Sequence, residues 1–320
     1  MKRNYMTLAI FLCFASLLVG VVIKYFPFNS KKGVLDDNIF IHTNFEEKSD
    51  AYKKIKYLAK AFNKIGAKAK ILSFEEKESS EYNIYIVNDI TNLPKVKNLD
   101  AINVLWCPYI AFNDDIENFR DFDVIVVKSM PSFSHLKAIN ARVAFIPDAI
   151  DMKKVDKKTN NRILYYGNNN NAFSLVMYLT KDYDIDIIGK GWSYSDVRKK
   201  VIKTEPKNDD FSKYDFVLID QTEEEIMNNI VNSDLIKVLE NGGVPVVRFN
   251  PGISDLFDDR VIMYYNEEDF HKTINDIVKN KNIVRDMKSA LYARLDDWNS
   301  LSVANKFTEI FQIMKKKRIN

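Results

Sequence analysis

The residues of this chain best suited to bind a ligand surround a glycine-rich break in its second half. The run Ser233–Val247 reads SDLIKVLENGGVPVV, an amphipathic stretch that ends at a Gly-Gly pair and is followed by a short β-branched segment. Glycine ends a helix because it tolerates positive φ, and a β-branched run suits a buried strand. Open α/β sheets bind ligands where helices and strand ends meet in this way. Lys237, Glu240 and Gly243 are therefore candidate ligand-binding residues.

Backbone amides near two other glycines are candidates for binding phosphate. Gly167 and Asn168 follow a predicted strand, and Gly252, Ile253 and Ser254 follow a proline that opens a turn. N–H groups at helix N-termini and in such turns face anions without needing a metal ion. We expect both segments to lie at the carboxyl edge of a sheet.

Other polar residues have weaker claims. Lys190, between two glycines, could lie near the same ligand or could be a solvated loop residue. His42 ends the first predicted strand and is the tentative catalytic candidate, although a structural histidine explains it equally well. Trp106–Tyr109 follows another strand and could line a second substrate. Asp148 and Asp151 lie in a predicted crossover, where a helix cap is the alternative.

Hydrophobic periodicity predicts alternating strands and helices, which is typical of a parallel sheet covered by helices on both faces. The predicted strands are 38–43, 68–73, 82–87, 102–106, 124–128, 143–146, 162–166, 185–188, 216–220 and 244–247, and the predicted helices are 50–65, 131–140, 172–179, 233–240, 269–279 and 283–295. The pattern restarts after a polar stretch near 148–161. We therefore predict two doubly wound, Rossmann-like α/β domains, 38–150 and 151–320, that face each other across a ligand-binding cleft.

The N-terminal residues 1–37 are expected to be an anchor and tether. Met6–Ile23 contains 18 residues without a charge, which just reaches the length of a membrane-spanning helix. A cleaved signal peptide and a buried helix are the alternatives. Lysines flank both ends, so the positive-inside rule does not decide which side of the membrane carries the rest. The expected location is the membrane, through one N-terminal span.

Composition excludes several classes of protein. The net charge is +3, but five basic residues precede the first acidic one, and without them 42 basic residues face 44 acidic ones. This balance argues against nucleic acid as a partner. The two cysteines, Cys13 and Cys107, form no disulfide framework, and the three histidines lack the spacing of a metal site. The basic run Lys315–Arg318 is expected to be a solvated tail, with contact to anionic lipid as the alternative.

Four segments, taken in order, resemble a GT-B glycosyltransferase of the group 1 type, and most closely the branch of spore-maturation (CgeB-like) proteins. They are Phe145–Asp151 (FIPDAID), Ile163–Gly167 (ILYYG), Asp186–Trp192 (DIIGKGW) and Ser233–Phe257, which ends in PGISDLF. The resemblance covers residues 140–312 well and 38–139 in outline. It implies a metal-independent, retaining transfer from a nucleotide-sugar donor, held by the second domain, to a glycan, lipid or protein acceptor, held by the first. It implies no cofactor beyond the nucleotide-sugar, which is a co-substrate.

One departure from the family pattern bears on this function. Relatives carry a glutamate five residues before the glycine of the helix–strand step, where it contacts the donor ribose. Here the two possible glycines place Val238 or Lys237 at that position, and Glu240 is out of phase. A catalytically degenerate or non-enzymatic two-domain sugar- or nucleotide-binding protein is therefore the alternative. A metal-dependent GT-A transferase would need the Asp184–Asp186 motif at the exit of a strand, whereas here it enters one.

Overall fold

The computed structural model describes residues 37–91, 93–107, 119–139, 141–152, 162–168, 185–192, 202–203 and 211–319. The predicted anchor Met6–Ile23, nearly all of the tether and the predicted helix 172–179 lie outside these residues. None of the helices that the structure does describe combines the length and the apolar run needed to cross a bilayer.

The first half of the chain forms a six-stranded parallel sheet in the order β2-β1-β3-β4-β5-β6. Its strands are β1 (Asn38–Thr43), β2 (Lys68–Ser73), β3 (Tyr82–Ile86), β4 (Ile102–Cys107), β5 (Val124–Val127) and β6 (Val143–Phe145). Each predicted strand is confirmed to within one or two residues. The central strands β3, β4 and β5 are buried along their whole length, as expected for a parallel sheet covered on both faces.

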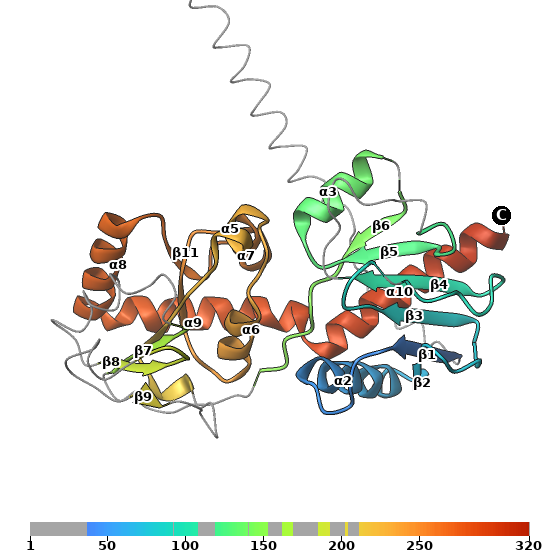
Figure 1. Ribbon diagram of the computed structural model, residues 1–320, viewed down its shortest axis with the longest axis horizontal. Coiled ribbons are helices and arrows are strands. Elements are labelled where there is room, and N and C mark those ends of the chain that lie inside the picture. Colours follow the sequence, from blue (N-terminus) through green and yellow to red (C-terminus); the bar gives the residue numbers. More distant parts are fainter. Residues whose placement is uncertain are drawn as a thin grey trace, which may run out of the picture. The chain divides into compact units, whose positions relative to one another are not determined.

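Helices cover both faces of this first sheet. On one face, α2 (Asp50–Lys64) and α10 (Ser300–Ile319) share a hydrophobic core with alternate residues of the strands, such as Ile39 and Ile41 (Figure 1). On the other face, Leu136 of α3 (Met130–Ala138) packs with Tyr85 and Leu105. The alternation of side chains along a strand decides which of these two cores each residue enters.

The second half forms another six-stranded parallel sheet, in the order β12-β11-β10-β7-β8-β9. Its strands are β7 (Ile163–Tyr166), β8 (Ile185–Ile188), β9 (Ile202–Lys203), β10 (Phe216–Ile219), β11 (Pro245–Arg248) and β12 (Ile262–Tyr264). Helices α5 (Glu223–Met227), α6 (Ser233–Glu240), α7 (Pro251–Phe257), α8 (Glu267–Lys279) and α9 (Lys281–Leu295) accompany it, with 3-10 turns at Phe211–Lys213 and Asp296–Trp298. The strands β9 and β12 and the helix α7 were not predicted as elements. The fold class, two Rossmann-like α/β halves, is confirmed.

The last helix does not follow the predicted domain boundary. The predicted second domain includes all residues from 151 to 320, and the last predicted helix ends at residue 295. Instead, α10 returns to the first sheet, where Val303, Phe307 and Phe311 are fully buried. These residues recur every fourth position, so they form one apolar stripe along the helix. By packing, α10 belongs to the first half.

The basic run at the C-terminus is also held by the first half. The Lys315 ammonium group lies 2.9 Å from a Glu81 carboxylate oxygen. The Arg318 guanidinium group contacts both carboxylate oxygens of Asp123, at 2.7 and 2.9 Å. The expectation of a solvated tail is therefore wrong for Lys315 and Arg318, because they pair with carboxylates at the edge of the first sheet.

Candidate active site

A cavity of about 540 Å³ lies at the carboxyl ends of the first sheet's strands, beside helix α6 of the second half. Its polar lining contains four lysines and five acidic residues: Lys53, Lys54, Lys128, Lys237, Asp50, Asp148, Asp151, Asp234 and Glu240. Phe45, Ile86 and Trp106 are among its apolar lining residues. Strand carboxyl ends are where α/β sheets bind ligands, so we take this cavity as the candidate active site.

Helix α2 carries Lys54 to the cavity. The helix begins directly after the loop that follows β1, and its N-cap Ser49 accepts a hydrogen bond of 3.1 Å from the Tyr52 amide. Ile55 and Leu58 are buried against the sheet, which fixes the rotation of the helix. Lys54, one turn from the N-terminus, then faces the cavity.

An ion pair across the cavity joins the two halves. The Lys54 ammonium lies 3.6 Å from a Glu240 carboxylate oxygen, and the two side chains are 27% and 25% exposed. Burial raises the pKa of Glu240, and the charges of Asp148 and Asp151 raise it further, whereas Lys54 opposes this shift. Glu240 is thus a cavity carboxylate whose pKa is shifted upward, toward the protonated form.

A second pair lies on the first half alone. The Lys128 ammonium is 2.7 Å from an Asp148 oxygen and lies 4.9 Å above the centre of the Trp106 ring. The indole N–H of Trp106 donates to the Ile146 carbonyl at 3.0 Å, which fixes the ring. Burial would raise the pKa of Asp148, but the positive charges of Lys128 and Lys54 outweigh it and hold the pKa below its usual value. Asp148 is therefore a carboxylate of the cavity whose charged form is favoured.

Helix α6 carries Lys237 and Glu240 to the cavity, as the sequence analysis placed them. Leu235, Val238 and Leu239 are fully buried, so the opposite face of the helix turns toward the cavity. The Lys237 ammonium donates to the Tyr166 hydroxyl at 2.9 Å and lies 5.4 Å from the centre of that ring. Tyr166 ends strand β7, so Lys237 lies near the strand ends of the second sheet. Their role in binding a ligand stays a prediction.

Two of the predicted glycines are required for packing. A Cβ atom on Gly243 would lie 2.6 Å from Val238 Cγ1 and 2.8 Å from Phe211 Cβ. A Cβ atom on Gly167 would lie 2.7 Å from Asp220 Cβ. The Gly243 amide donates to the Val238 carbonyl at 2.9 Å. Gly243 thus lets α6 turn closely into β11, and neither glycine lines the cavity among the described residues.

The amides of Gly252, Ile253 and Ser254 are already paired within the chain. Gly252 N–H donates to the Asn250 side chain at 2.8 Å, and the other two donate to the Asn250 carbonyl at 3.0 Å. A Cβ atom on Gly252 would lie 2.1 Å from the Asn229 carbonyl oxygen. These residues start helix α7 rather than an open turn. The expectation that their amides face a phosphate is not supported by this arrangement, because the Asn250 cap takes the donors.

Asn168 and Lys190 hold two strand ends together. The Lys190 amide donates to the Asn168 side chain at 2.8 Å, and its own side chain is exposed. Trp192 is 9% exposed and donates from its indole to the Gly167 carbonyl at 2.9 Å. It packs edge-on against Tyr165 and is a core residue. None of these residues lines the candidate cavity.

His42 is on the wrong face of the sheet for catalysis in this cavity. It is fully buried, stacks on Tyr85 with 4.5 Å between ring centres, and its Nε2 lies 3.3 Å from the Asn83 side-chain oxygen. Its neighbour Ile41 faces α2 and α10, so alternation turns His42 toward the opposite core. The end of the strand was predicted correctly, but the direction of the side chain was not. Burial lowers the pKa of His42.

The remaining candidate carboxylates have structural partners. Asp151 accepts a hydrogen bond of 2.9 Å from the Ser300 amide and another from the Ser300 hydroxyl, so it holds the start of α10. Asp186 pairs with Arg162 and accepts a hydrogen bond of 3.0 Å from the Tyr214 hydroxyl. Among the described residues, no group of three or more His, Cys, Asp and Glu side chains is arranged to bind a metal ion.

Lys54 and Lys128 are among the cavity residues that the sequence pattern did not indicate as candidates. Lys128 directly follows strand β5. Ligand-binding residues are expected at the carboxyl ends of parallel strands, so the strand pattern could have indicated Lys128. Lys54 carries no such signal. Its role follows from its contact with Glu240, and only the folded chain brings those two residues together.

Comparison with known proteins identifies the fold. No protein-family model matches this chain, and no curated protein matches its sequence. Solved structures match along nearly their whole length. They include T4 phage BGT in complex with UDP and Mn2+ (12% identity, TM-score 0.51, 86% of this chain and 98% of that one), a glycosyltransferase from Rickettsia africae (10%, 0.57, 88% and 99%) and an alpha-glucosyltransferase with UDP and a 13-mer DNA (12%, 0.58, 87% and 99%).

These matches define the class of fold. Two parallel Rossmann-like sheets in one chain, similar along their length to these transferases, form a GT-B fold. At 10–12% identity the similarity concerns the fold, and the chemistry has to be argued from the cavity.

Proposed function

We propose that this chain is a glycosyltransferase that moves a sugar from a nucleotide-sugar, of the UDP-glucose kind, to a glycan, lipid or protein acceptor. The observation that carries the proposal is the cavity at the strand ends, where lysines from both halves converge. Lys54 and Lys128 come from the first half and Lys237 comes from the second. The similar solved structures include transferases in complex with UDP.

Glycosyl transfer requires fixed positive charge near the departing diphosphate, and the lysines of this cavity supply it. The departing nucleoside diphosphate gains negative charge as the bond to the sugar breaks, and fixed cations in a partly enclosed cavity stabilise that charge. Lys237 is held by Tyr166, and Lys54 is held by Glu240, so both are positioned before a substrate arrives. Three ammonium groups can perform this task without a metal ion, which is the metal-independent mechanism we propose.

The carboxylates have complementary roles in this proposal. Asp148 remains ionised beside Lys128 and can accept hydrogen bonds from sugar hydroxyls. Glu240, with its raised pKa, can take up or release a proton near the acceptor hydroxyl. The likeness to CgeB-like group 1 enzymes adds the proposal of a retaining outcome, which the anomeric proton of the product would report by NMR.

One observation favours the alternative, a binding protein without transferase activity. Of the two positions where the family resemblance would place a ribose-binding glutamate, Val238 is fully buried and cannot reach a ligand, and Lys237 has the opposite charge. A two-domain protein that binds a nucleotide-sugar without turning it over would tolerate this change. The two functions differ in turnover and not in binding.

A donor screen on the full chain separates these functions. We expect UDP-glucose or another nucleotide-sugar to raise the unfolding temperature, and Lys237→Ala to weaken binding about tenfold, because a charged contact to phosphate contributes roughly 1.5 kcal/mol. Release of free UDP from the sugar nucleotide identifies the enzyme, and binding without release identifies the binding protein. Lys272→Ala, at an exposed position of α8 outside the cavity, is the control. Failure of every nucleotide-sugar to bind would refute both.

We also propose attachment to a membrane through Met6–Ile23, whose apolar length motivates it. Alkaline extraction of membranes tests this. Full-length chain should remain in the pellet, whereas a chain starting at Leu35 should be released. Release of the full-length chain would refute the proposal.

A further inference from the structure

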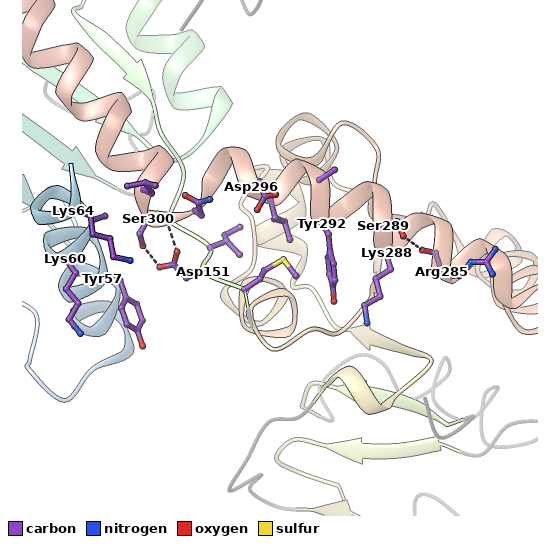
Figure 2. A pocket seen from close by; sticks show the side chains of 17 residues that line it. Tyr57, Lys60, Lys64, Asp151, Arg285, Lys288, Ser289, Tyr292, Asp296 and Ser300 are labelled. Carbon is purple, nitrogen blue, oxygen red and sulfur yellow. Dashed lines mark hydrogen bonds between the residues drawn. The ribbon is translucent and has the colours of Figure 1, made fainter. Parts of the chain in front are cut away.

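A second and larger hollow, of about 930 Å³, lies between helices α2 and α9. Figure 2 shows Tyr57, Lys60 and Lys64 on α2 at one end and Lys288 and Tyr292 on α9 at the other. Between them lie the crossover Ile150–Met152 and the start of α10. We call this hollow the α2–α9 groove.

We propose that the α2–α9 groove binds a linear chain of phosphodiester-linked polyol or sugar units, which is the acceptor of the transferase. The second part of this statement rests on the proposed function. Four features of the groove support this proposal: its charge, the spacing of its cations, its continuity with the active-site cavity and the ammonium groups that lie over its tyrosine rings.

The groove is positively charged, in a chain whose residues from Asp36 onward include 42 basic and 44 acidic side chains. Its lining has four cations, Lys60, Lys64, Arg285 and Lys288, and two carboxylates, Asp151 and Asp296. Asp151 accepts hydrogen bonds from the Ser300 amide and hydroxyl, so its oxygens are already engaged. Arg285 also lies 3.3 Å from an oxygen of Asp286, and the four lining cations still exceed the two lining carboxylates by two. A local excess of positive charge attracts and orients anions.

The cations are spaced along two helices rather than gathered around one point. On α2, Tyr57, Lys60 and Lys64 occupy positions i, i+3 and i+7, and on α9 an arginine, a lysine and a tyrosine have the same spacing. The two cations on each helix are three or four residues apart, about 5 Å along the axis. Two pairs of cations at opposite ends of the hollow suit a chain carrying several phosphates better than one small anion.

The groove continues into the active-site cavity. Tyr57 and Asp151 line both hollows. A chain lying in the groove can therefore place its end near Lys54 and Glu240, where we propose that transfer occurs. A polymer that grows or is decorated at one end would use both hollows at once.

The tyrosines favour a polyol or sugar chain over nucleic acid. The Lys60 ammonium lies 5.9 Å from the centre of the Tyr57 ring, and the Lys288 ammonium lies 5.3 Å from that of Tyr292. The Tyr292 hydroxyl also donates to the Gly242 carbonyl at 3.2 Å. Proteins that bind single strands stack bases on open aromatic faces. Here an ammonium group lies over each ring, so the groove offers charge and hydroxyl contacts.

The test measures binding of a synthetic six-unit glycerol-phosphate oligomer to the full chain in detergent, without nucleotide, by calorimetry at two salt concentrations. We expect binding that weakens with salt, and about a tenfold loss in K60Q/K64Q and in R285Q/K288Q. The control K272Q/K279Q changes the same charge on exposed positions of α8, outside both hollows, and should bind as the unmodified chain does.

Three outcomes overturn the proposal. They are no binding of the oligomer, equal binding in all three double variants, and tighter binding of a single-stranded oligonucleotide with the same number of phosphates. Binding of UDP-glucose and of other nucleotide-sugars is measured on the same preparations. Oligomer binding without binding of any nucleotide-sugar supports the groove as a polyanion site and refutes the proposed function, whereas nucleotide-sugar binding without oligomer binding overturns the groove alone.

Discussion

At the scale of single residues, the structure replaces one catalytic candidate by a set of ion pairs. His42, at the end of a strand, was predicted to face a ligand and instead lies in the core beside Tyr85. Lys54 and Glu240, far apart in sequence, meet across the cavity. A strand end can be predicted from a β-branched run, but which face each side chain takes depends on the helices that cover the sheet.

His42→Phe is expected to change the pH dependence of stability. Burial disfavours the charged imidazole, so the pKa of native His42 is below its ordinary 6.5. Below pH 6.5 the unfolded chain therefore binds more protons, and the free energy of unfolding falls as pH falls. This single group contributes a slope of at most about 1.4 kcal/mol per pH unit. Phenylalanine keeps the stacking on Tyr85 and removes the slope.

Urea unfolding of both chains at pH 7.5, 6.0 and 5.0 measures this effect. The difference in unfolding free energy between them should change steadily over that range, and a constant difference would contradict the assignment. UDP-glucose binding by His42→Phe should match that of the unmodified chain, because the side chain is on the other face of the sheet. Loss of binding with unchanged stability would return His42 to the active site.

At the scale of elements, the helix–strand step from α6 to β11 combines a ligand-facing side with a tightly packed one. Lys237 and Glu240 face the cavity, whereas Val238 is buried beneath them and contacts Gly243 closely. The sequence predicted this step correctly, because an amphipathic stretch, a Gly-Gly pair and a β-branched run each have a local cause. Its glycine serves the packing of the step, which no local pattern reveals.

Gly243→Ala is expected to destabilise the second half. The added Cβ would lie 2.6 Å from Val238 and 2.8 Å from Phe211, so the helix must shift. Overpacking of this kind typically costs about 1–3 kcal/mol. Thermal unfolding measures the loss. In a chain that already carries Val238→Ala, Gly243→Ala should lower the free energy of unfolding by less, because the close contact with Val238 Cγ1 is gone. Equal costs in both backgrounds would contradict the packing explanation.

At the scale of the whole molecule, the sequence predicted two α/β halves but assigned the last helix to the wrong one. The strands and helices were found because each carries its own period of apolar residues. The destination of α10 is not encoded in such a period, since its stripe of Val303, Phe307 and Phe311 would suit either sheet. The strands β9 and β12 were missed because two or three residues are too few for a pattern.

Phe307→Ala is expected to destabilise the first half by about 3–5 kcal/mol. The ring is fully buried, and its centre lies 5.1 Å from that of Trp106 and 6.4 Å from that of Phe62. Phe307→Leu keeps most of the volume and should cost less. Hydrogen exchange followed by mass spectrometry should show faster exchange in β1, β3 and β4 than in the second sheet. Faster exchange confined to the second sheet would contradict the packing of α10.

The return of α10 sets the order in which the protein can be completed during synthesis. Domains generally fold as units, the N-terminal one first, as the chain leaves the ribosome. Here the first sheet lacks one of its two covering helices on one face until residues 300–319 have been translated. The strands and most helices of the second sheet are made before α10 and have their own described core. The half that is made later can therefore fold first, and the half that is made earlier keeps part of an apolar face exposed until α10 has been made.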